Sequence, residues 1–290
     1  MNGSKISIPL LLPANISTLA APTPPPGFEA EIYYDTSKTF NPLGVYLCAL
    51  DFMYALAQKG WNTILNGGYT VWVNGFDVEI DVESEEGSIS SLPLESSHIV
   101  LGFYKTIVDV STQSRFCEVL TTLWLHRRQV GTIVIEKRKL ENGGSDIANS
   151  SLVNGFPRNN TVTYPSGRVF DTDEHDFSIS YTYSGVRINS KDIFLAALDA
   201  LATAAQFSPD SAFRSLNAIS ISGDCVINML EDDSSSKLNY SFVTKALRIL
   251  LMDVMVHLRI FEEITLQLEW RMLKMAEGSI KLANHRTTVQ

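Results

Sequence analysis

Apolar and polar residues alternate along several short stretches of the chain, which is the pattern of a β-strand with one buried face. In the first half of the sequence this alternation covers 28–35, 71–82 and 115–135. The second stretch contains Asn74-Gly75, the strongest short signal for a hairpin turn. The first stretch therefore predicts one strand, and the other two predict hairpins.

Between these stretches the apolar residues return every three or four positions, as they do on one face of an α-helix. The first helix is expected to begin at Asn41-Pro42, because asparagine caps a helix and proline suits its first turn. The second is expected over 98–113. The resulting order, β-α-β-β-α-β-β, matches the ferredoxin-like βαββαβ order with one strand added. Two helices would then cover one face of an antiparallel sheet and leave the other face free.

A stretch of the first predicted helix is repeated in the second half of the chain. LCALDFMYALAQ at 47–58 and LAALDALATAAQ at 195–206 share six residues at one constant spacing, 199 − 51 = 148. The hairpin around Gly75 returns around Gly223 at the same spacing, and another helix is expected over 239–257. The sequence therefore predicts two tandem copies of one α+β domain, related by a pseudo-two-fold axis.

Local composition sets the expected domain boundaries. Residues 1–27 end in a run of prolines, which predicts a leader or arm, and 139–175 are rich in Gly, Asn and Ser, as linkers are. The first repeat is expected at 28–138 and the second at 176–283. A short tail is expected at 284–290.

Composition and charge exclude several classes of function. The 290 residues are 45% hydrophobic and carry a net charge of −9, so the chain can fill large cores but offers no basic surface for nucleic acid. No apolar run approaches the roughly 20 residues of a membrane-spanning helix, so integral membrane association is not expected. No zinc, phosphate-loop or dinucleotide motif occurs, and the three cysteines are scattered. We therefore expect neither a metal nor a cofactor.

The sheet face turned away from the helices is where the two copies differ most. In the first copy, strand parity places aromatic and acidic residues there, whereas Ser220, Ile227 and Met229 are expected at aligned positions of the second. Aromatic planes beside carboxylates can stack on a sugar ring, hold a cation, or bind a polycyclic ligand while a carboxylate acts as acid or base. The candidate catalytic residues are Glu31, Glu79 and Asp81, and the candidate ligand-binding residues are Tyr33, Trp72, Trp124, Gln267 and Glu269. The alternative is that these side chains pack the two sheets together or lie in solvent.

The segment VLGFYKTIVDVSTQSRFCEVLTTLWLHRRQVGTIVI at 100–135 resembles a pattern in uncharacterised proteins of filamentous fungi, the ascomycetes. The shared features are a helix ending in an acid-apolar pair, an Arg-Phe step, and a hairpin with glycine near its return. This resemblance implies a fungal origin and a secreted protein without an assigned activity. Five Asn-X-Ser/Thr sequons also favour secretion slightly over the cytoplasm.

Two classes of function remain open. In the first, a cleft between the repeats binds an apolar or polycyclic small molecule, and the protein is a candidate cofactor-independent isomerase or cyclase of fungal secondary metabolism. In the second, it is a non-catalytic secreted interaction module that binds a macromolecule or a carbohydrate. A buried pocket lined by Trp72 and Trp124 would support the first class, and a flat, exposed aromatic face would support the second.

Overall fold

The computed structural model describes residues 22–85, 92–138, 166–232 and 238–283. The first half contains β1 (Phe28–Thr39), α1 (Pro42–Ala57), β2 (Tyr69–Trp72), β3 (Val78–Ser84), α2 (Ser96–Gln113), β4 (Cys117–Leu125) and β5 (Arg128–Lys137). The second half contains β6 (Ser166–Phe170), β7 (Phe177–Arg187), α3 (Ser190–Ala204), β8 (Ser215–Ile219), β9 (Cys225–Glu231), α4 (Tyr240–Ile249), the π-helix η1 (Leu250–Val256), β10 (Glu262–Trp270) and β11 (Leu273–Leu282). The predicted cap of α1 is confirmed, because the Asn41 side chain accepts a hydrogen bond from the Leu43 N–H at 2.9 Å.

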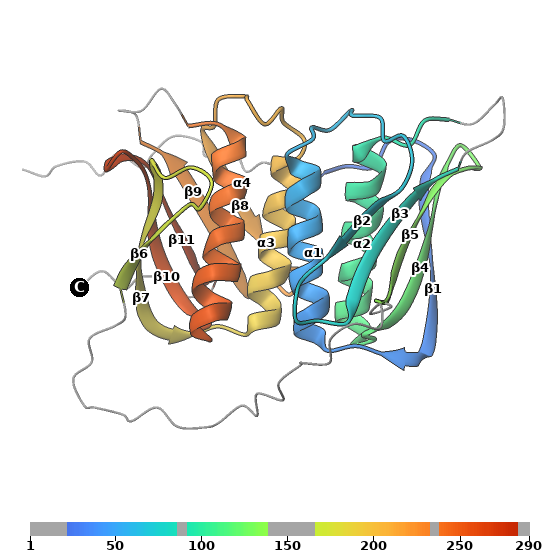
Figure 1. The fold of residues 1–290 in the computed structure, drawn as a ribbon, viewed down its shortest axis with the longest axis horizontal. Helices are drawn as coiled ribbons and strands as arrows, with labels where there is room; N and C mark the ends of the chain where they lie inside the picture. Colours follow the sequence, from blue (N-terminus) through green and yellow to red (C-terminus); the bar gives the residue numbers. More distant parts are fainter. Residues whose placement is uncertain (1–21, 86–91, 139–165, 233–237, 284–290) are drawn as a thin grey trace, which may run out of the picture.

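In the described part of the chain, helices α1 to α4 lie between two antiparallel sheets, which form the two outer sides (Figure 1). The first sheet has the strand order β1-β4-β5-β3-β2, and the second has the order β6-β7-β10-β11-β9-β8. Apart from β6, the two sheets show the same order when strands are counted within each half. Each sheet turns one face to the helices and the other face outward. The expected α+β architecture is therefore confirmed.

Two features differ from the sequence-based expectation. Within the described residues β1 lies at an edge of its sheet and pairs with β4 alone, so the ferredoxin-like arrangement is not confirmed. The predicted linker at 139–175 contains β6, which pairs with β7 and was missed because five residues carry too little alternation to reveal a strand. Most of the predicted leader, 1–21, and the tail, 284–290, lie outside the described residues.

The two halves meet through their helices, and residues one repeat apart meet each other. The rings of Tyr46 on α1 and Phe194 on α3 stack with their centroids 5.2 Å apart and their planes 2° apart. These residues are separated by 194 − 46 = 148, which is the spacing of the repeated helix. Both rings belong to one continuous cluster of buried apolar residues, so the halves share a core.

A second pair of equivalent contacts joins the halves but differs in chemistry. Asp51 on α1 lies 2.5 Å from the guanidinium of Arg248 on α4 and forms an ion pair with it. In the counterpart, Asp199 on α3 hydrogen-bonds to Tyr104 on α2 and accepts the Ile219 N–H at 3.2 Å. Asp51 and Asp199 are equivalent residues of the two halves, because 199 − 51 = 148. Tyr104 and Arg248 are equivalent too, because 248 − 104 = 144 is the spacing of the second helix of each half. Asp199 therefore has no cationic partner in this contact, and its burial raises its pKa.

The last helical segment of the second half contains one residue more than its counterpart. The N-caps, Glu95 and Asn239, are 144 residues apart, as 239 − 95 shows. The left-handed residues that end the two segments, Ser114 (φ 54°) and Arg259 (φ 55°), are 145 apart. The π-helix η1 lies between these ends and accommodates the extra residue without interrupting the helix.

The repeat spacing also changes in the β8–β9 hairpin, and this moves its side chains to the other face. Ile80 and Ile227 occupy corresponding buried positions, 227 − 80 = 147 residues apart rather than 148. The expectation that Ser220, Ile227 and Met229 lie on the outer face is therefore wrong, because all three are buried. A slip of one residue reverses the face, since side chains alternate along a strand.

Candidate functional site

The outer face of the first sheet carries the aromatic and acidic side chains that the sequence pattern indicates. Tyr33 is 55% exposed, Trp72 is 44% exposed, and Trp124 is partly buried. Because the helices cover the opposite face of the sheet, this face points away from the second half (Figure 1). The predicted cleft between the repeats is therefore not lined by Trp72 and Trp124.

Contacts within the chain already occupy part of this aromatic surface. The Tyr33 hydroxyl donates a hydrogen bond to the Glu31 carboxylate at 2.9 Å, and this bond is the main cause of the raised pKa of Tyr33. The guanidinium carbon of Arg138 lies 4.6 Å from the centroid of the Trp72 ring. A cation of the protein itself therefore covers the ring that was expected to hold a ligand.

The three candidate catalytic carboxylates are not brought together in one site. Glu31 lies on β1, whereas Glu79 and Asp81 lie on β3, and β4 and β5 separate these strands. Neighbouring strands are about 4.8 Å apart, so Glu31 is at least about 14 Å from the other two. An acid and a base at this separation do not reach the same bond of a small substrate.

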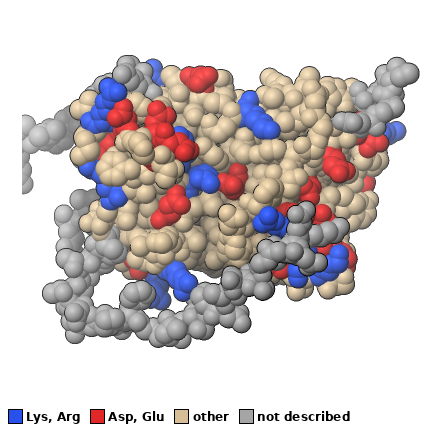
Figure 2. Space-filling model, viewed as in Figure 1, with Lys and Arg blue, Asp and Glu red and all other residues tan. Residues whose placement is uncertain are grey.

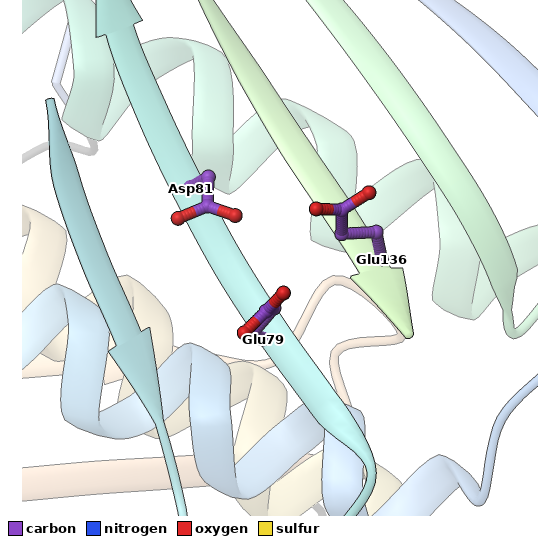
Figure 3. Close-up of side chains that lie close together, drawn as sticks. All are labelled: Glu79, Asp81 and Glu136. Atoms are coloured by element: carbon purple, nitrogen blue, oxygen red, sulfur yellow. The ribbon is translucent and has the colours of Figure 1, made fainter. Parts of the chain in front are cut away.

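Glu79 and Asp81 instead gather with Glu136 of β5 (Figure 3). One carboxylate oxygen of each residue lies within 4.8 Å of the other two, and Glu79 and Glu136 are direct cross-strand partners. The Thr70 hydroxyl donates a hydrogen bond to Asp81. Carboxylate oxygens are ligands for Ca²⁺ and Mg²⁺, so among the described residues a cation would fit best here. Glu136 was missed at the sequence level, although strand parity over 128–137 places it on the outer face. That no metal is required stays a prediction.

A groove of about 920 Å³ lies on the outer face of the second sheet. All six strands of this sheet contribute to its lining. Its centre is a row of hydroxyl and amide side chains that follows the pairing register from one edge of the sheet to the other. The row consists of Ser166, Thr182, Thr265, Ser279, Asn228 and Asn217.

The charged residues of this groove are largely paired with each other or with neighbours. Arg168 lies 2.8 Å from the buried carboxylate of Glu269, and Glu277 lies 3.0 Å from Lys274. Gln267, a predicted ligand-binding residue, lines the groove between these two ion pairs. Glu269, the other predicted residue of this sheet, holds Arg168 in place. The groove therefore presents a mainly neutral hydrogen-bonding surface.

The corresponding row on the first sheet has a different chemistry. It consists of Tyr33, Leu120, Val134, Asp81 and Thr70. Aromatic, aliphatic and acidic side chains thus stand where the second sheet has threonines, a serine and asparagines. The sequence pattern indicated the sheet face on which the two copies differ, but the larger groove lies on the second copy. Aligning 215–231 with the first half at a spacing of 147, and then reading which side chains alternate outward, would have located this groove from the sequence.

The molecular surface shows no extended basic region on the side seen in Figure 2, where Lys and Arg side chains are interspersed with Asp and Glu. Within the residues that the structure describes, no helix has both the length and the apolar character needed to cross a bilayer.

Comparison with family models and with curated proteins found no match to this sequence. Among solved structures, the chain was aligned with the tandem DUF26 ectodomain of the Arabidopsis thaliana cysteine-rich receptor-like protein PDLP5. The alignment has 10% identity, covers 88% of this chain and 98% of that chain, and gives a TM-score of 0.23. A second alignment is with a protein provisionally assigned as a thioesterase from Novosphingobium aromaticivorans, with 13% identity, coverage of 88% and 94%, and a TM-score of 0.13. TM-scores this low do not show a common fold, so function must be inferred from the geometry of this chain.

Proposed function

We propose that the protein is a non-catalytic binding module whose second sheet binds a neutral oligosaccharide. The observation that supports this most directly is the groove of about 920 Å³ with its uninterrupted row of hydroxyl and amide side chains. The volume lies within the range of about 300–1,000 Å³ that is common for small-molecule sites. The groove opens to solvent along the sheet, which suits a short segment of a sugar chain.

The polarity of the row favours a ligand that is rich in hydroxyl groups. Serine, threonine and asparagine side chains both donate and accept hydrogen bonds, as sugar hydroxyls do. An apolar ligand would leave these groups unpaired at a cost of about 1–3 kcal/mol for each buried group. The buried Oδ1 of Asn217 has no hydrogen-bond partner among the described residues, so rotation of this side chain toward a ligand hydroxyl would satisfy an unpaired acceptor.

The charge distribution argues against a strongly charged ligand. The guanidinium of Arg168 is neutralised by Glu269, and the carboxylate of Glu277 by Lys274. A sulfated or highly acidic sugar would have to compete with these ion pairs. Lys281 remains at one end of the groove and would tolerate a single acidic group.

The origin and history of the protein form the second part of the proposal. The sequons and the resemblance to fungal proteins support a secreted fungal module. The stacking of Tyr46 on Phe194 supports a tandem duplication whose copies are related by a pseudo-two-fold axis. A cofactor-independent isomerase or cyclase is not proposed, because Glu31 lies far from Glu79 and Asp81.

Titration calorimetry with neutral oligosaccharides tests this function. Fragments of glucan, xylan, mannan and chitin would be titrated into the wild type, Thr265→Val and Thr132→Val. Thr265 lies in the groove, whereas Thr132 faces outward on the first sheet and serves as the matched control. Loss of one hydrogen bond, worth about 0.5–1.5 kcal/mol, should make the binding of the oligosaccharide to Thr265→Val about 2- to 10-fold weaker than its binding to the wild type. Thr132→Val should bind as the wild type does.

Two results would contradict the proposal. One is that none of the neutral fragments binds at millimolar concentration to the folded wild type. The other is that Thr132→Val weakens binding as much as Thr265→Val, which would place the site on the first sheet or make the effect unspecific.

A further inference from the structure

A second cavity, of about 490 Å³, lies at the junction of the two halves, away from the groove on the second sheet. Its walls are mainly apolar. Phe28 belongs to β1, Leu101, Tyr104 and Val108 belong to α2, and Ile221 reaches it from the turn between β8 and β9. Of the residues that the structure describes, Ile221 is the one lining residue from the second half, so this cleft is a pocket of the first half that the second half bounds on one side.

Ile221 is an unusual residue in the lining of this cleft. It is a large aliphatic residue on a tight turn, and it is 56% exposed. At the spacing of 147 that applies in this hairpin, its counterpart is Asn74, so the second half has an apolar residue where the first half has a polar one. Ile221 stands over the apolar residues of α2, with a cavity between. Filling that cavity with an apolar group would remove this surface from water, which is favourable by about 25 cal/mol per Å².

The charged groups of the cleft have a net charge of −1, from Glu29, Glu31 and Lys105. The Lys105 ammonium donates a hydrogen bond to the Ala30 carbonyl at 2.8 Å. Neither Glu29 nor Glu31 forms an ion pair with any of the described residues. Glu29 and Glu31 are two positions apart on β1 and both line this cavity, and the Glu31 carboxylate also accepts the hydrogen bond of the Tyr33 hydroxyl. Their negative charge beside an apolar cavity favours a ligand with a positive charge.

Tyr104 keeps a further cation out of this cleft. At the equivalent position of the other half stands Arg248, whose guanidinium would compete with a cationic ligand for the carboxylates. Burial is the main cause that raises the pKa of Tyr104, so its hydroxyl stays protonated and remains a neutral partner of Asp199. The two copies thus differ at this position in a way that makes one of them suitable for a cation.

We propose that the cleft binds a small apolar molecule that carries a protonated amine. The apolar part lies between Leu101 of α2 and Ile221, and the ammonium group points to Glu29 and Glu31. This site is independent of the oligosaccharide site, because the two cavities have no lining residue in common.

Three naphthalene derivatives of similar size test this proposal: 1-naphthylmethylamine, 1-naphthylmethanol and 1-naphthoate. Their affinities would be measured by titration calorimetry at pH 7 with the full chain. The amine should bind more tightly than the alcohol, and the alcohol more tightly than the carboxylate. In the double variant Glu29→Gln and Glu31→Gln the preference for the amine should fall by about 2- to 5-fold per carboxylate, the range of exposed ion pairs.

The apolar contact would be tested with Ile221→Ser. This variant should bind the amine and the alcohol about 3- to 10-fold more weakly than the wild type does. Leu273→Ser is the matched control, because Leu273 is 72% exposed on the β10–β11 hairpin and does not line the cleft. Glu83→Gln is the control for the loss of a negative charge, because Glu83 does not line the cleft. It should leave the preference for the amine unchanged. Ile221 is exposed, so its replacement leaves the core intact, and unfolding curves would verify this.

Absence of binding of the amine at millimolar concentration to the wild type would overturn the proposal. So would an unchanged preference for the amine in the double variant, or equal losses in Ile221→Ser and Leu273→Ser. Thr265→Val should leave the affinity for the amine unchanged, so failure of the oligosaccharide site and failure of this site are distinguished.

Discussion

The contact between Asp51 and Arg248 and its counterpart between Asp199 and Tyr104 predict opposite effects of the same substitution. Asp51→Asn removes the negative charge of an ion pair that is 2.5 Å long and partly buried. Asp199→Asn removes a buried negative charge that no cation neutralises in this contact. The first variant should therefore be less stable than the wild type at neutral pH. The second should be as stable as the wild type or more stable.

The size of the first effect follows from burial. The side chains of Arg248 and Asp51 are 34% and 26% exposed, which places the pair between the surface and the interior. Exposed pairs are worth about 0.2–1 kcal/mol, whereas breaking a fully buried pair costs about 3–5 kcal/mol. A loss of about 1–2 kcal/mol in the free energy of unfolding is therefore expected for Asp51→Asn.

The second effect depends on pH. The pKa of Asp199 is higher in the folded protein than its ordinary value near 3.8, because burial disfavours the charged form. The folded state therefore binds this proton more tightly than the unfolded state, and stability falls as the pH rises through the folded pKa. Asparagine has no charge to bury. The advantage of Asp199→Asn should thus be greatest at pH 7 and should shrink as the pH falls toward 4.

Urea unfolding of the wild type and both variants, followed by far-UV circular dichroism between pH 4 and pH 7, measures these free energies. Equal destabilisation by both substitutions at pH 7 would refute the reasoning. So would an Asp199→Asn effect that does not change with pH, since the buried charge would then not be the cause.

Three further predictions concern other parts of the fold. Phe194→Ala should cost about 3–5 kcal/mol and lower the melting temperature of the whole chain in one calorimetric transition, because the halves share a core; two separate transitions would contradict this. Glu31→Gln should lower the pKa of Tyr33 toward its ordinary value in a spectrophotometric phenol titration, since the Glu31 hydrogen bond is the main cause of the shift. Removing divalent cations with EDTA should leave the melting temperature unchanged, and a clear decrease would assign a structural cation to the carboxylate cluster on β3 and β5.

Much of the fold could be predicted from local patterns. The Asn41 cap, the helical spacing of 47–58 and its copy at 195–206 identified α1 and α3, two helices in which most residues are apolar and buried. What the pattern could not show was that the helices of both halves pack on each other. That packing depends on residues such as Tyr46 and Phe194, which look like ordinary core residues until their partner is known.

The candidate site was harder to predict, because it depends on register. A spacing of 148 fits the helices, whereas 147 applies in the β8–β9 hairpin, and the difference of one residue reverses the inner and outer faces there. The row that contains Asn217 and Asn228 was hidden for this reason. Gln267 was assigned to the correct face, because the spacing of 145 in β10 is consistent along the strand.

Mapping the binding surface by NMR tests the central claim most directly. The backbone amide signals of the full chain would be followed while the tightest-binding neutral oligosaccharide is added. The structure predicts that the largest shift changes occur in β7, β9, β10 and β11 around Thr182, Thr265, Ser279 and Asn228, with the first sheet unaffected. Changes confined to the outer face of the first sheet, or no changes with any neutral oligosaccharide at millimolar concentration, would contradict the account.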